Sequence, residues 1–69
     1  MKELEVGDLV KDKYGDIGTV VGVNDERTEV DIYDYDLDEG WCVKYDEVVC
    51  IGVNKKFLAG EYDDYECRP

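Results

Sequence analysis

The amino-acid sequence predicts an all-β domain, a small five-stranded barrel followed by an irregular acidic C-terminal tail. Short runs rich in valine and tyrosine alternate with turns that carry glycine, asparagine or aspartate, which is typical of strands joined by tight connections. No window shows a sustained 3.6-residue apolar period, so no long amphipathic helix is expected. A chain of 69 residues is enough for one domain with a thin core.

The first two strands are expected over residues 8–13 and 19–23, with a glycine-bearing turn over 14–18 between them. Gly22 interrupts the second run, and a glycine inside a strand favours a bulge or a close backbone approach. A polar turn over 24–27 then leads into the third strand.

The third strand, residues 28–34, has the clearest alternation in the chain. In this pattern Val30 and Ile32 face the core. Glu29, Asp31 and Tyr33 face solvent. A turn over 35–40 follows. The alternating stretch 41–45, a single helical turn over 46–48 and a last strand over 49–53 complete the predicted barrel.

The predicted barrel therefore occupies residues 1–55, and residues 56–69 form an extension that packs on the barrel or trails from it. Trp41 and Phe57 are the largest apolar groups and are expected to be at least partly buried. The predicted core consists of Val10, Val20, Val23, Val30, Ile32, Val43, Val48 and Ile51.

Residues 5–53 resemble a KOW-type module, the small SH3-like barrel of some ribosomal proteins and transcription elongation factors. The resemblance rests on the stretch VGDLVKDKYGDIGTVVGV, on the strand TEVDI and on the closing segment WCVKYDEVVCI. It implies a five-stranded barrel with a helical turn before the last strand. Members that bind nucleic acid carry lysine and arginine on the barrel surface, whereas this chain carries acids, so it resembles an acidic variant.

The stretch DIYDYDLDEGW, residues 31–41, has two further interpretations. Its letters IYDYD resemble the ALYDY motif that opens SH3 domains, but the later groove residues of that family have no counterpart here. Its alternating acids are typical of the start of an EF-hand calcium loop. Such a loop needs glycine at position six and glutamate at position twelve, where this chain has Glu39 and Tyr45. We interpret the stretch as strand, turn and strand.

The composition argues against catalysis and against a cofactor or metal site. The chain contains no histidine, serine or glutamine, so the usual general base at neutral pH is missing. Cys42, Cys50 and Cys67 match no metal-binding spacing, and acidic surroundings raise the pKa of a thiol. We expect a protein that is not an enzyme. The odd number of cysteines, without a signal peptide or an apolar span, predicts a cytoplasmic protein that makes no membrane contact.

The charge points to the kind of partner. Nineteen acidic residues against eight basic ones give a net charge of −11, which repels nucleic acid and anionic lipid. Tyrosines are interleaved with the acids, and tyrosine is enriched in protein interfaces. The first hypothesis is a binding module for a protein with a basic surface, through Glu29, Asp31, Tyr33, Asp34, Tyr35, Asp36 and Asp38.

Two other hypotheses come from different classes. In one, the acids imitate the phosphates of nucleic acid, and the chain inhibits a DNA- or RNA-binding protein, as phage and mobile-element proteins do. In the other, the chain is a KOW-like module associated with nucleic acid, although its charge disfavours direct contact. The extension adds four more acids and two tyrosines in the stretch EYDDYEC, residues 61–67.

Overall fold

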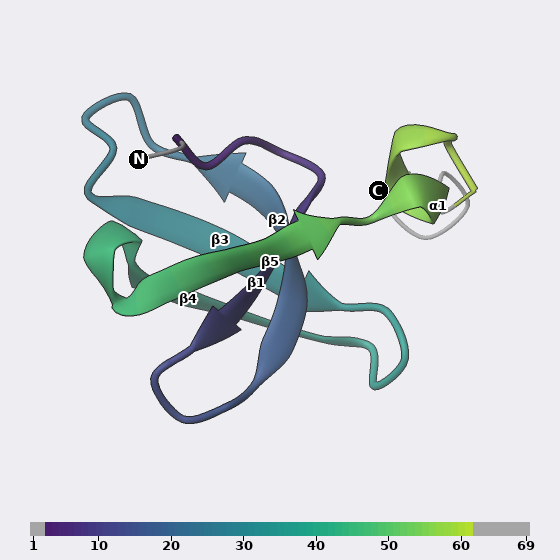
Figure 1. Ribbon diagram of the computed structural model, residues 1–69, viewed down its shortest axis with the longest axis horizontal. Helices are drawn as coiled ribbons and strands as arrows, with labels where there is room; N and C mark the ends of the chain where they lie inside the picture. Colours follow the sequence, from purple (N-terminus) through teal and green to yellow (C-terminus); the bar gives the residue numbers. More distant parts are fainter. Residues whose placement is uncertain (1–2, 62–69) are drawn as a thin grey trace.

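The computed structural model describes residues 3–61, which form one antiparallel five-stranded sheet that curls strongly on itself (Figure 1). The predicted all-β fold, with a helical turn before the last strand, is confirmed. The sheet order is β4-β3-β2-β1-β5, so the last strand returns to pair with the first. The elements are β1 (Asp8–Asp12), β2 (Ile17–Val23), β3 (Glu29–Asp34), β4 (Glu39–Lys44), the 3-10 turn η1 (Tyr45–Glu47), β5 (Val48–Val53) and α1 (Lys55–Leu58).

The core lies on the inner face of the curled sheet and is built mainly from valine and isoleucine. Four of its side chains, Val10, Val20, Val30 and Ile32, are at most 1% exposed. Each such side chain contributes about 1.5–3 kcal/mol when it leaves water. Gly18 shares this face, where a Cβ atom would clash with the side chain of Ile32. The residues that pack around the core at partial exposure are Val23, Trp41, Val43, Tyr45 and Cys50.

A bulge in β2 explains how Val20 and Val23, three residues apart, both reach the core. Val20 pairs with Ile32, but the next paired residue is Gly22, opposite Asp31. Val21 is therefore the extra residue, and its side chain is 37% exposed. The bulge was predicted at Gly22, which is the adjacent residue.

The prediction that Ile51 belongs to the core is wrong. Ile51 is 49% exposed, whereas Cys50 packs against the core. Val48 is buried at the start of β5, and the two-residue period of a strand then turns position 50 inward and position 51 outward. The register of β5 does shift at this point, since Val10 pairs with Cys50 and Leu9 with Gly52, but Ile51 is the extra residue between them and stays exposed.

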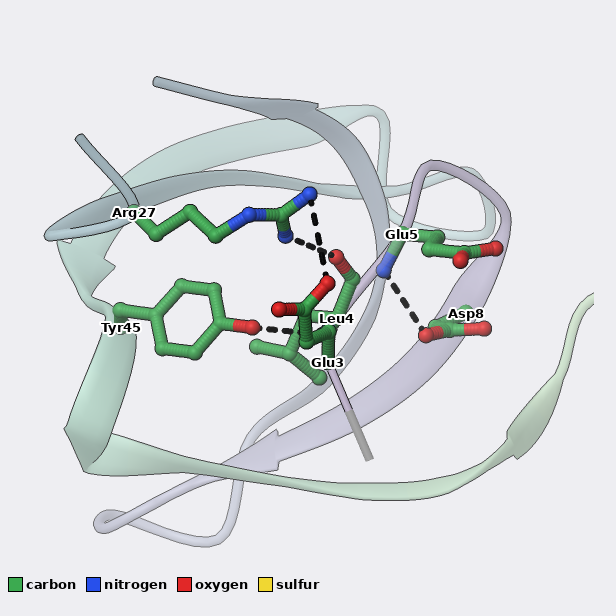
Figure 2. Close-up of polar contacts among 6 residues, drawn as sticks. All are labelled: Glu3, Leu4, Glu5, Asp8, Arg27 and Tyr45. Atoms are coloured by element: carbon green, nitrogen blue, oxygen red, sulfur yellow. Dashed lines mark hydrogen bonds and ion pairs between the residues drawn. The ribbon is translucent and has the colours of Figure 1, made fainter. Parts of the chain in front are cut away.

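The N-terminal segment supplies a core residue that the sequence pattern did not reveal. Leu4 is 5% exposed, and Figure 2 shows its backbone held from two sides. Its N–H donates to the Tyr45 hydroxyl at 2.7 Å, and its carbonyl accepts from Arg27 Nη1 at 3.1 Å. Arg27 also pairs with the Glu3 carboxylate at 3.6 Å. The segment before β1 is thus fastened over one end of the barrel.

The predicted extension begins with one helical turn that docks on the outer face of the sheet. Asn54 joins the two parts: its side-chain oxygen accepts from the N–H of Phe57, and its amide donates to Thr19 Oγ1 at 2.7 Å. Leu58 lies against Gly7, whose φ of 102° and lack of a Cβ atom permit this approach. The rest of the extension, including Cys67 and most of the stretch EYDDYEC, lies outside the described residues.

Nowhere in residues 3–61 is a helix long and apolar enough to cross a membrane.

Candidate binding surface

The seven predicted binding residues lie in β3 and in the turn that follows it. Glu29 and Asp31 are exposed along the strand, where they lie opposite Lys44 and Cys42 of β4. Further along, the predicted residues are split between half-buried and exposed positions. Tyr33, Asp34 and Tyr35 are half-buried, and Asp36 and Asp38 are exposed.

The two tyrosines are part of an aromatic cluster rather than free anchors. Tyr33 faces outward, as predicted, but its ring meets that of Tyr35 edge-on at 4.8 Å between centroids. Tyr35 in turn lies 6.3 Å from the ring of Phe57 in α1. These contacts cover much of both tyrosines and tie the β3–β4 turn to the helix. Tyr33, Asp34, Tyr35 and Asp36 line a shallow groove of about 340 Å³ here, together with Thr19 and Asn54.

The acids on β3 act on the thiol of their neighbour in β4. Partial desolvation, the hydrogen bond with Asp31 and the negative charges of Glu29 and Asp31 together raise the pKa of Cys42 above its ordinary value. A thiol with a raised pKa stays protonated at neutral pH and is a poor nucleophile.

We expect Asp31→Asn to lower the pKa of Cys42, because it removes a carboxylate that opposes the thiolate. Alkylation by iodoacetamide near pH 8 should then accelerate, because its rate follows the thiolate fraction. Mass spectrometry of the peptide that contains Cys42 measures the rate, with Asp36→Asn as a control for charge. Equal rates in the wild type and both variants would contradict the assignment.

Aspartates at the strand ends build the two turns that flank a second, larger groove. Asp12 Oδ1 accepts from the backbone N–H groups of Tyr14 and Asp16, both at 2.9 Å. In the same way, Asp34 Oδ1 accepts from the N–H groups of Asp36 and Leu37 at 2.9 and 3.2 Å. Aspartate favours such turns because its side chain hydrogen-bonds the backbone two or more residues on. Both carboxylates are thus fixed in position.

Between these turns lies a groove of about 630 Å³, here called the acidic groove. Four of its residues are acidic, and no lysine or arginine is among the residues that line it. The neighbouring Lys13 pairs through its Nζ with Glu47 at 3.2 Å, and the same Nζ lies 5.3 Å from the ring centroid of Tyr14 at the edge of the groove. The lining residues are Asp12, Tyr14, Asp16, Ile17, Asp34, Leu37, Glu39, Gly40, Trp41, Cys42 and Val43.

The acidic groove is also lined by apolar side chains. Tyr14 and Leu37 are 76% and 66% exposed. Trp41 packs between the core and the groove, and its indole N–H is buried without an acceptor among the described residues. An unsatisfied buried donor costs about 1–3 kcal/mol, which phenylalanine at this position would avoid. The groove therefore combines negative charge with accessible aromatic and aliphatic surface.

Of the seven predicted residues, only Asp34 lines the acidic groove, and the other groove residues were missed. The reason is that the groove joins the β1–β2 turn to β4, which are far apart in the sequence. A usable signal was present in the repeated pattern of an aspartate at a strand end followed by a turn with a bulky residue, as in DKYGD and DYDLD.

The described acids do not form a metal centre. Within residues 3–61, no three cysteine, aspartate or glutamate side chains converge closely enough to hold a metal ion. The negative charge of the acidic groove is thus spread along its length.

In comparisons with known proteins, no family model matches the chain, and no significant match was found among curated proteins or solved structures.

Proposed function

We propose that this chain is a non-enzymatic binding module whose acidic surface contacts a basic surface of a partner protein. The acidic groove carries this proposal, because four carboxylates surround exposed apolar side chains without a lysine or arginine in the lining. Asp36 and Asp38 extend the negative surface beyond the groove. Apolar surface flanked by charge of one sign suits a partner of opposite charge.

The fold supports a binding role. Five antiparallel strands with a helical turn before the last are the arrangement that the resemblance to SH3-like barrels and KOW-type modules implies. Direct contact with nucleic acid is disfavoured, because a net charge of −11 repels phosphates. A protein partner is therefore the better candidate within this fold class.

The proposal is tested with the immobilised chain and an extract of its native host. Proteins retained at low salt are identified by mass spectrometry, purified and measured by surface plasmon resonance. We expect the association rate to fall steeply with salt, as the Debye length shrinks from about 30 Å at 0.01 M to about 8 Å at 0.15 M. The double variant Asp16→Lys and Glu39→Lys, which reverses two exposed charges of the acidic groove, should slow association about tenfold at low salt.

Affinity that is indifferent to salt and to these charge reversals would contradict the proposal. If the purified partner binds DNA or RNA, and nucleic acid competes with this chain for it, the phosphate-mimic hypothesis replaces the simpler one. If the partner has no nucleic-acid site, the mimic hypothesis is wrong.

A further inference from the structure

We propose that the acidic groove receives an arginine side chain presented by an exposed segment of the partner. This inference rests on the proposed function and specifies its contact. It is drawn from the chemistry of the groove lining, which contains two carboxylates held by turns, two further carboxylates and an indole ring.

The charge of the groove is arranged for a cation. Asp12 and Asp34 are held by the turns that they cap, so their carboxylates need no reordering when a ligand arrives. Asp16 and Glu39 are exposed, and among the described residues neither carboxylate accepts a hydrogen bond that holds the fold. They remain available to a guanidinium group, which donates paired hydrogen bonds to carboxylates.

The apolar part of the groove favours arginine over a small cation. Leu37 and Ile17 offer aliphatic surface against which the methylene stem can pack. Trp41 contributes an indole ring to the lining, and a guanidinium stacks on aromatic faces more readily than an ammonium group does. A metal ion would gain nothing from these side chains, and the described acids do not converge on one point.

Trp41 is the only tryptophan in the chain, so its fluorescence reports directly on the groove. The probe is a capped pentapeptide in which two arginines alternate with glycines. A matched peptide carries citrulline, which has the shape of arginine without its charge. We expect the arginine peptide to change the emission of Trp41 in a saturable way and the citrulline peptide to have no effect.

Two variants with equal charge separate the groove from the general acidic surface. Asp16→Asn with Glu39→Gln removes two carboxylates from the groove. Asp25→Asn with Glu26→Gln removes two exposed carboxylates from the β2–β3 turn, at the other end of β2 and β3. Circular dichroism verifies that both variants remain folded. We expect the first variant to weaken peptide binding about tenfold and the second to change it less than twofold.

Each remaining outcome overturns the inference. Equal weakening by the two variants would show that net charge, and not the groove, attracts the peptide, and the proposed function would stand. Equal binding of the citrulline peptide would remove the cation from the contact. No saturable change with the arginine peptide would also exclude the groove as its site. The salt dependence measured with the native partner then decides separately whether the proposed function survives.

Discussion

Val30→Asp is expected to unfold the domain. Val30 is 1% exposed in β3, where it lies between Val23 of β2 and Val43 of β4. Burying an unpaired carboxylate among these side chains costs several kcal/mol, whichever protonation state it adopts. A domain of this size has a total stability of only about 3–10 kcal/mol. The substitution therefore removes most or all of the available stability.

Far-UV circular dichroism and a thermal melt measure this effect. Val30→Ala is the graded comparison and should cost about 2 kcal/mol, since it removes buried methyl groups without adding charge. Asp31→Asn, one position along on the exposed face, should leave the melting temperature within a few degrees of the wild type. A folded Val30→Asp variant with an unchanged melt would show that the faces of β3 are assigned the wrong way round.

The strands of this chain could be predicted because their signals are local. Along β3 the two-residue alternation identifies Val30 and Ile32 as buried, and both are. Aspartate and glycine mark the turns, and the tight 3-10 turn η1 falls within one residue of the predicted helical turn. Each of these features depends on neighbouring residues, so the sequence alone is enough to place it.

The features that were missed depend on contacts between distant segments. Leu4 becomes a core residue only because Arg27 and Tyr45 hold its backbone, and these lie 23 and 41 residues further along the chain. The spacing of apolar residues within the first ten positions could not reveal that Leu4 is buried. The half-burial of Tyr35 has the same origin, since it depends on Phe57 of α1.

The candidate site was predicted only in part for a related reason. The two-residue alternation of β3 correctly places Glu29 and Asp31 on its outer face. It does not show which turn lies beside which strand. The acidic groove arises where the β1–β2 turn faces β4 across the curled sheet, and this depends on sheet order and curvature. The sequence predicts an acidic surface with aromatic side chains, and only the fold shows where carboxylates and Trp41 meet.

Leu4→Ala is expected to lower the free energy of unfolding by about 2–4 kcal/mol, a large share of the stability of so small a domain. Leu4 is 5% exposed, and its loss leaves a cavity under a segment that cannot collapse freely, because hydrogen bonds fix its backbone on both sides. Leu37→Ala makes the same chemical change at a position that is 66% exposed and should alter stability by less than about 0.5 kcal/mol.

Tyr45→Phe tests the hydrogen bond that holds the N-terminal segment. It removes the hydroxyl that accepts from the N–H of Leu4, while the ring that packs against the core remains. We expect a cost of about 1 kcal/mol by urea denaturation. The double variant with Leu4→Ala should lose less free energy of unfolding than the sum of the two single losses. Once the leucine side chain is gone, the hydrogen bond with Tyr45 no longer holds a buried group in place. Strict additivity would mean that the hydrogen bond and the buried side chain act independently, and a neutral Leu4→Ala would mean that the N-terminal segment is not part of the core.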